Sequence, residues 1–180
     1  TMRNFIAKPQ GPAENRPGFF FVKEVKDSTK QTRLIPFRFN VSQTMVIEMG
    51  QEYFRFHTLG ATLQYTNGSA WNSNGTYSVG EIVIHNNVNY YAKTTTQNNQ
   101  PPNATYWYAL PSDMTYEVPS PYQESELFDI KFVQSSDVMT LVHPNHEPAE
   151  LRRYGATLWQ FVDIDFTAAI SAPTIASVVA

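Results

Sequence analysis

Residues 157–166 read Thr-Leu-Trp-Gln-Phe-Val-Asp-Ile-Asp-Phe, ten positions over which apolar and polar side chains broadly alternate. Successive side chains of a β-strand point to opposite faces, so this pattern is typical of a strand. Shorter segments of the same kind are found at 19–25, 33–40, 44–49, 53–57, 61–65, 131–134 and 138–143. Short strands at this spacing predict an all-β protein with antiparallel sheets, arranged as a sandwich or as part of a propeller.

The composition of the 180-residue chain excludes several classes of protein. Cysteine is absent, which excludes disulfides, a thiol nucleophile and cysteine-based zinc sites. The net charge of −3 does not favour binding to nucleic acid. The longest uncharged runs are polar, so we expect no membrane segment.

The charge is distributed unevenly along the chain. Between Thr66 and Leu110 only Glu81 and Lys93 are charged, although 16% of the whole chain is charged. The same window holds nine of the 13 asparagines. Such a change in composition indicates an inserted module.

We therefore expect a discontinuous domain at 1–65 and 115–170 with a small inserted module at 66–112. Within the module we predict three β-strands, namely a hairpin of 77–84 with 89–93 and a last strand at 106–110. In the flanks, 8–18 is predicted to be an irregular or extended lead-in, 124–129 to hold one helical turn, and 149–153 to be a short helix or an extended link. Residues 171–180 are expected to be a linker to a missing C-terminal part of a longer polypeptide.

Two groups of residues could carry chemistry. His143, His146 and Glu147 could ligate a metal ion, but Pro144 favours a turn and no further ligand follows at a typical spacing. We therefore expect a solvated turn, no metal and no cofactor. Acid–base chemistry could instead use Asp163 with Asp165, which share one strand face.

A second acidic group consists of Glu124, Glu126 and Asp129. Paired carboxylates of this kind could hydrolyse glycosides. The plainer interpretation is a polar strand face and a polar loop, so we expect that the protein is not an enzyme.

The inserted window resembles a known kind of small module. It carries, in order, Trp71, Tyr77, Gly80, Glu81, Val83, Asn86, Tyr90, Tyr91, Ala92, Asn99, Gln100, Pro101 and Trp107. This order and spacing resemble the chitin-binding modules of carbohydrate-binding families 5 and 12, over roughly residues 69–111. Glu81 stands where these modules usually have Asp.

The resemblance implies sugar binding through flat aromatic faces. These modules present exposed aromatic residues in the loop that here spans 93–100, which has none. Trp71, Tyr77 and Trp107 match positions of the module's small core. The remaining candidates for carbohydrate binding are Tyr91, Tyr106 and Tyr108.

The flanks resemble a different family. Residues 3–18 read Arg-Asn-Phe-Ile-Ala-Lys-Pro-Gln-Gly-Pro-Ala-Glu-Asn-Arg-Pro-Gly. Further matching phrases occur at 33–39, 45–50, 53–56, 133–144 and 151–155, followed by Trp159. Together they resemble the podophage and prophage tail nozzle family, also called tail tubular protein B, over about 1–65 and 115–166.

That resemblance implies a structural protein of a bacteriophage tail, found in the virion or in the bacterial cytoplasm as a prophage product. The expected partners are other copies of the chain in a ring and neighbouring tail or adaptor proteins, with DNA only as passing cargo. One alternative is an adhesion module for host cell-surface polysaccharide. Another is a tail-associated glycoside hydrolase.

Overall fold

The protein is built around two facing antiparallel sheets. The computed structural model describes residues 4–38, 40 and 44–167. The first sheet has the order β13-β5-β4-β3, with β6 paired to β5. Its strands are β3 (Arg33–Arg38), β4 (Thr44–Gly50), β5 (Tyr53–Thr58), β6 (Ala61–Thr62) and β13 (Glu117–Pro119).

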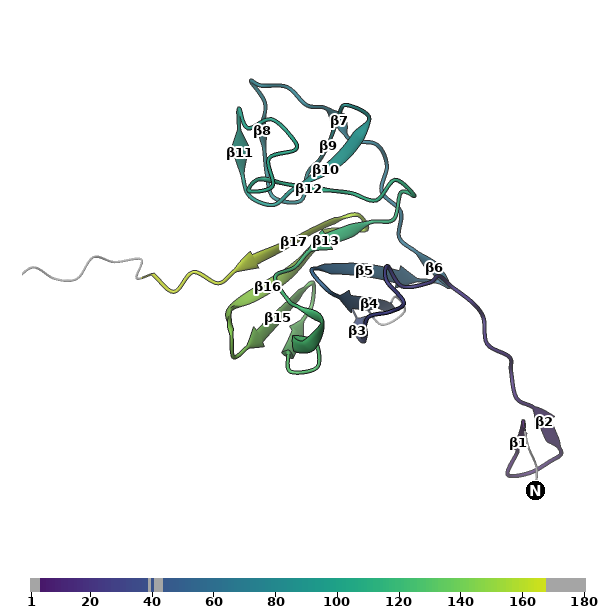
Figure 1. Ribbon diagram of the computed structural model, residues 1–180. Coiled ribbons are helices and arrows are strands. Elements are labelled where there is room, and N and C mark those ends of the chain that lie inside the picture. The colour runs from purple at the N-terminus through teal and green to yellow at the C-terminus, as the bar shows by residue number, and fades with distance from the viewer. Residues whose placement is uncertain (1–3, 39, 41–43, 168–180) are drawn as a thin grey trace, which may run out of the picture.

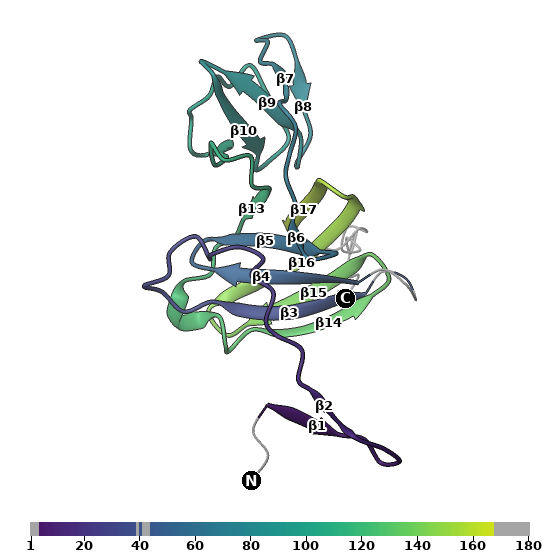
Figure 2. The same cartoon turned by 90° about the vertical axis from the view of Figure 1, so that its right-hand side faces the viewer.

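The second sheet is a meander with the order β14-β15-β16-β17. Its strands are β14 (Lys131–Ser135), β15 (Val138–His143), β16 (His146–Gly155) and β17 (Leu158–Asp163). Figure 2 shows this sheet behind β3, β4 and β5. The all-β, antiparallel prediction is therefore confirmed, and the arrangement is that of a sandwich.

Alternating side chains fill the space between the two sheets. Trp159 is fully buried, and its ring stacks on Phe56 at 4.2 Å between centroids and meets Phe37 edge-on at 4.9 Å. Phe161, two residues along β17, contacts Phe54 at 5.7 Å. The face of β17 that carries Trp159, Phe161 and Asp163 thus points to the core, with Asp163 at its exposed end.

The inserted module forms its own sheets. Its main sheet has the order β12-β10-β9-β7, and β11 pairs with β8 in a second one. The strands are β7 (Ser69–Ala70), β8 (Thr76–Tyr77), β9 (Ile82–His85), β10 (Val88–Ala92), β11 (Thr96–Gln97) and β12 (Trp107–Ala109). The three predicted strands are present in part, as β9, β10 and β12. Short additional strands pair at their margins, so the module is larger than a three-stranded sheet.

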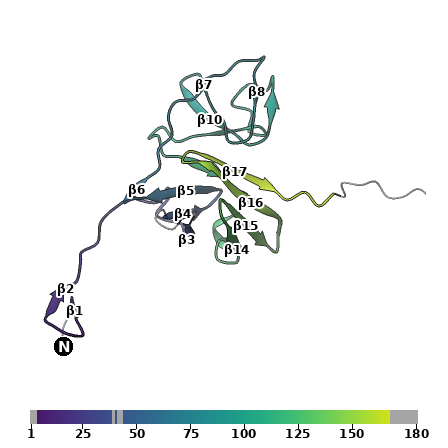
Figure 3. The same ribbon diagram turned by 180° about the vertical axis from the view of Figure 1, so that it is seen from behind.

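The chain leaves the sandwich and returns to it at paired positions. Gln64 forms an isolated antiparallel bridge with Thr115, and the backbone N–H of Tyr65 donates to the carbonyl of Met114 at 2.9 Å. Figures 1 and 3 show the module on the β13 and β17 side of the sandwich. The module therefore occupies the place of a hairpin loop.

One local prediction was wrong, and two others were right only in their extended alternative. Residues 19–25 form no strand, because this segment has no neighbouring strand to pair with; Phe19, Phe20 and Phe21 are 92%, 79% and 78% exposed. Residues 149–153 lie inside β16, where pairing with β15 and β17 on both sides favours an extended backbone. The segment 8–18, predicted to be irregular or extended, contains the turn and the second strand of a hairpin between β1 (Phe5–Ala7) and β2 (Ala13–Asn15).

The helical content is small. One 3-10 turn, η1 (Glu124–Glu126), is present in the predicted place. Among the residues that the structure describes, no helix has the length and hydropathy needed to span a membrane. The expected linker at 171–180 lies outside the described residues.

Candidate functional site

The inserted sheet has two faces with different roles. Val83, Tyr90, Ala92 and Trp107 form the module's own small core, with Trp71, Tyr77 and Tyr106 packed against it. The opposite face carries Tyr91, which is paired across the sheet with Ile82 and Tyr108. These three side chains pack against the core of the sandwich. The structural role predicted for Trp71, Tyr77 and Trp107 is confirmed.

Tyr91 makes the most enclosed contact between the two parts. It is 1% exposed, and its hydroxyl donates a hydrogen bond to the carbonyl oxygen of Trp159 at 2.8 Å. Burial raises the pKa of the Tyr91 hydroxyl, and the neighbouring Tyr116 adds to this effect. The phenol therefore remains protonated and continues to donate at neutral pH.

A buried carboxylate makes the second contact. Glu117 is fully buried, and its Oε1 accepts hydrogen bonds from Nε and Nη2 of Arg55 at 2.8 and 2.7 Å. Its Oε2 accepts from the Tyr108 hydroxyl at 2.7 Å and from Lys26 Nζ at 2.8 Å. Burial and the Glu117 charge both raise the pKa of Tyr108. One carboxylate thus joins the sandwich, the module and the N-terminal segment.

The backbones of the module and the sandwich come close together at Gly80. This residue has φ +91°, and a Cβ atom placed on it would lie 2.9 Å from the backbone oxygen of Trp159. Only glycine combines that backbone conformation with so close an approach. Next to it, Gln160 Nε2 donates to the carbonyl of Val79 at 2.8 Å.

A cleft of about 600 Å³ opens beside this contact, between the module and the sandwich. Its lining includes the aromatic residues Tyr91, Tyr108 and Phe161 and the polar residues Lys93, Ser120 and Asp163. Aromatic surface combined with hydrogen-bonding groups is suited to a polar ligand with apolar ring faces, such as a sugar. This cleft is the best candidate in the described structure for a site that binds a small organic ligand.

The three tyrosines predicted to bind sugar do not lie together on one exposed surface. Tyr91 and Tyr108 both line the cleft, but Tyr91 is buried and the Tyr108 hydroxyl is held by Glu117. Tyr106 packs against the module's core and not in the cleft. The reason is that the sandwich covers the sheet face that carries Tyr91 and Tyr108. Sequence reasoning did not identify Phe161 and Lys93 as lining residues, since nothing in their local pattern marks them.

The predicted acidic pair is not enclosed. Asp163 and Asp165 are both exposed, and Asp165 lies beyond the end of β17. Asp165 accepts a hydrogen bond from the backbone N–H of Thr167 at 2.8 Å. The side chain of Thr167, and then this backbone N–H, lower the pKa of the Asp165 carboxyl group. Glu124 accepts from the Gln31 backbone N–H at 2.7 Å. These contacts are typical of structural carboxylates.

The turn at 143–146 is only partly as expected. The turn itself is present between β15 and β16, but His143 is just 8% exposed and His146 is half-buried. Glu147 is exposed. The expectation of a solvated turn was wrong for the two imidazoles, because the segment around η1 folds over the end of this hairpin and places Glu126 beside His146. Glu126 is distant in sequence, so no spacing motif could have identified it.

No protein-family model matches the chain, and no curated protein matches it either. The assignment of a function therefore depends on the geometry of the molecule and on the two resemblances of its sequence.

Proposed function

We propose that this chain is a structural component of a bacteriophage tail, part of its nozzle or tube, which assembles from identical copies and carries a carbohydrate-binding-like module. The resemblance of both flanks to the tail nozzle family supports the class of protein. A closed ring requires a heterologous interface, in which one surface of each copy meets a different surface of the next.

The observation that carries this proposal is the N-terminal arm, residues 4–22. In Figures 1 and 2 the β1–β2 hairpin stands away from the sandwich on an extended segment. That segment holds Phe19, Phe20 and Phe21, whose side chains are almost entirely exposed. Adjacent exposed aromatic residues are typical of a binding surface. An arm of this kind is suited to dock on a neighbouring copy.

The assembly is tested by light scattering coupled to size-exclusion chromatography and by negative-stain electron microscopy of the purified chain. We expect an oligomer of defined size, and a monomer when Phe19, Phe20 and Phe21 are all changed to Ser. Phe166→Ser is the control, because Phe166 is 75% exposed but lies outside the arm. An intact chain that remains monomeric at high micromolar concentration contradicts assembly through the arm.

The location in a tail is tested separately. Antibodies raised against the chain should label the tails of particles produced by the parent phage or induced prophage. Labelling of capsids only, or none, contradicts the assignment.

The cleft favours a second candidate function, adhesion to host cell-surface polysaccharide. Its aromatic and polar lining supports this alternative, together with the resemblance of residues 69–111 to chitin-binding modules. A glycan array carrying chitin, peptidoglycan and capsule fragments tests it, followed by NMR titration with the strongest ligand. We expect Lys93→Gln to weaken binding several-fold and Lys131→Gln, an exposed lysine of the sandwich, to leave it unchanged. No binding at millimolar ligand rejects this function.

A non-catalytic role fits the acidic residues. Asp163 lines the cleft, as Glu52 does, but Asp165 is not among its lining residues, so Asp163 and Asp165 are not the pair of carboxylates within one cleft that glycoside hydrolysis requires. The release of reducing ends from chitin, peptidoglycan or capsule by the purified chain would contradict this part of the proposal.

A further inference from the structure

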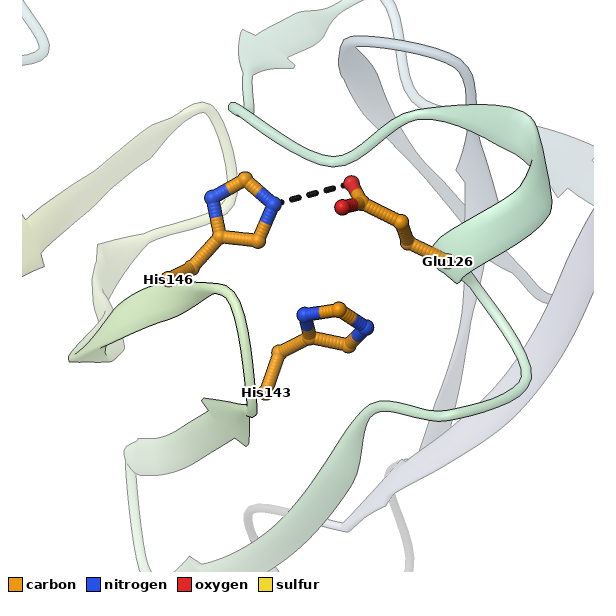
Figure 4. A group of neighbouring side chains, drawn as sticks. All are labelled: Glu126, His143 and His146. Atoms are coloured by element: carbon orange, nitrogen blue, oxygen red, sulfur yellow. Dashed lines mark hydrogen bonds and ion pairs between the residues drawn. The ribbon is translucent and has the colours of Figure 1, made fainter.

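Three potential metal ligands converge at one end of the second sheet. Glu126 comes from η1, His143 ends β15 and His146 begins β16. One ligand atom from each lies within 4.8 Å of the other two (Figure 4). We propose that Glu126, His143 and His146 form a binding site for a divalent transition-metal ion, with Zn²⁺ as the biological ion.

The hairpin geometry brings the two imidazoles together. His143 and His146 are paired directly across the β15–β16 ladder, with Pro144 and Asn145 forming the turn between them. Directly paired residues in an antiparallel ladder have their side chains on the same face. The ring centroids are accordingly 5.2 Å apart. The pairing is a consequence of the backbone, so the two imidazoles are neighbours before any ion binds.

The carboxylate is positioned by contacts of its own. The backbone N–H of Gln123 donates to Oε2 of Glu126 at 2.9 Å, and the same oxygen lies 2.8 Å from Nε2 of His146. Without metal, the Nε2–H of His146 donates a hydrogen bond to the carboxylate. When an ion binds Nε2, the neutral ring takes the tautomer with its proton on Nδ1, and the lone pair of Nε2 becomes a ligand.

The hydrogen bonds also define the state of His143. The backbone N–H of Asn145 donates to Nδ1 of His143 at 3.2 Å, so this ring is neutral with its one lone pair on Nδ1. Because a neutral imidazole has a single lone pair, binding of a metal by His143 replaces this hydrogen bond. A tetrahedral zinc ion with ligands about 2.0–2.1 Å away holds its ligand atoms roughly 3.4 Å apart. The ligand atoms of the three residues now lie within 4.8 Å of one another, so binding of one ion requires their side chains to move closer together.

The surroundings give a second, independent observation. Tyr122 is fully buried, with its ring centroid 5.0 Å from that of His146 and 6.2 Å from that of His143. Its hydroxyl has no hydrogen-bond partner among the described residues. A water molecule held by the ion as its fourth ligand would supply the missing partner.

The donor set selects the class of ion. Imidazole nitrogens favour Zn²⁺ and other first-row transition metals, whereas Ca²⁺ and Mg²⁺ prefer oxygen ligands alone. Two histidines and one carboxylate are a ligand set that zinc uses in proteins. Bound there, the ion would fasten the segment around η1 to the β15–β16 hairpin. This inference goes beyond the proposed function and does not depend on it.

The experiment uses the intact chain, freed of metal with a chelator. Zn²⁺ alone is titrated by calorimetry, and Co²⁺ is titrated by visible absorption, which reports coordination number. We expect one ion per chain, micromolar or tighter affinity, and zinc-induced shifts of the ¹⁵N resonances of His143 and His146. Glu126→Gln should weaken Zn²⁺ binding at least tenfold. His85→Asn is the matched control, because His85 lies in the inserted module beside Gln100 and should leave affinity unchanged.

The ¹⁵N measurement is made on the unaltered chain and so does not depend on how the variants fold. Circular dichroism of Glu126→Gln without metal checks that this variant retains its sheets. Three results overturn the site: no saturable binding below millimolar Zn²⁺, shifts confined to His57 or His85, or equal affinity of Glu126→Gln and the unaltered chain.

Discussion

The Tyr91 hydroxyl donates its hydrogen bond to the backbone carbonyl of Trp159, the residue whose indole occupies the centre of the sandwich core. The strand that fills the core therefore also holds the inserted module. The two parts share one continuous set of buried side chains, which includes both residues. We expect the module and the sandwich to unfold together.

Tyr91→Phe should lower the free energy of unfolding by about 1–2 kcal/mol, because the ring stays in place while the Trp159 carbonyl loses a buried donor. Urea unfolding followed by tryptophan fluorescence measures the change. Tyr106→Phe is the control, since no hydrogen bond of its hydroxyl is found in the described structure, and it should stay within about 0.5 kcal/mol. Equal effects of the two variants would contradict the importance of this hydrogen bond.

Glu117→Gln should cost about 3–5 kcal/mol, because it leaves Arg55, only 5% exposed, without its countercharge. Thermal unfolding monitored by circular dichroism measures the loss. The comparison is Glu14→Gln, which breaks the exposed ion pair with Lys8 and should change stability by less than about 1 kcal/mol. A small loss in Glu117→Gln would mean that water reaches Arg55.

Gly80→Ala should destabilise the protein by about 2 kcal/mol or more, because φ is positive and the added Cβ meets the Trp159 carbonyl. Gly11→Ala is the matched change at an open position, with no atom within 4 Å of the added Cβ. That variant should be neutral or slightly stabilising. Chemical denaturation of both proteins tests the difference, and a stable Gly80→Ala protein would argue against the close approach.

Glu48 should contribute to stability in a pH-dependent way. Its burial alone would raise the pKa of the carboxyl group, but hydrogen bonds from His57 and the Tyr53 hydroxyl and the charge of Arg55 outweigh burial and lower it below 4.5. A lowered folded-state pKa stabilises the fold above the unfolded-state pKa, and this contribution is lost as the pH falls below about 4.5.

Glu48→Gln should therefore reduce stability at neutral pH and give a shallower loss of stability below pH 4.5 than the unaltered chain. Urea unfolding at a series of pH values measures both slopes. Glu147→Gln, a change at an exposed glutamate, should leave the slope as it is. If the free energy of unfolding fell equally steeply with decreasing pH in the unaltered chain and in Glu48→Gln, Glu48 would not contribute to the loss of stability in acid.

Some sandwich strands could be predicted from the alternation of apolar and polar residues that one buried and one solvent-exposed face produce, as in β17. Others could be predicted from clusters of apolar residues, as in β4 and β5. The same logic failed for residues 19–25, because a pattern of apolar side chains does not reveal whether a partner strand exists. For residues 149–153 the sequence pattern left a short helix and an extended link open and did not predict a strand. There, Glu150, Arg152 and Arg153 obscure a strand that hydrogen bonding on both edges holds extended.

The candidate sites depended on contacts between distant segments. The resemblance of the module left Tyr91, Tyr106 and Tyr108 as candidates but could not indicate that β17 and β13 would cover the sheet face of Tyr91 and Tyr108. The histidine pair was visible in the sequence, whereas Glu126 is brought to it by the path of the chain after β13. Long-range convergence of this kind leaves no local pattern.

The bridge between Gln64 and Thr115 has a consequence for how such proteins change over generations. Because the chain departs and returns at neighbouring positions, residues 66–113 are a loop of the sandwich, and closing a longer loop costs only about 0.6 kcal/mol for each doubling of its length. A recombination event at these two points could remove or exchange the segment and leave the order and connections of the sandwich strands unchanged. The surfaces left uncovered near Trp159 and Glu117 would then be the places where compensating substitutions accumulate.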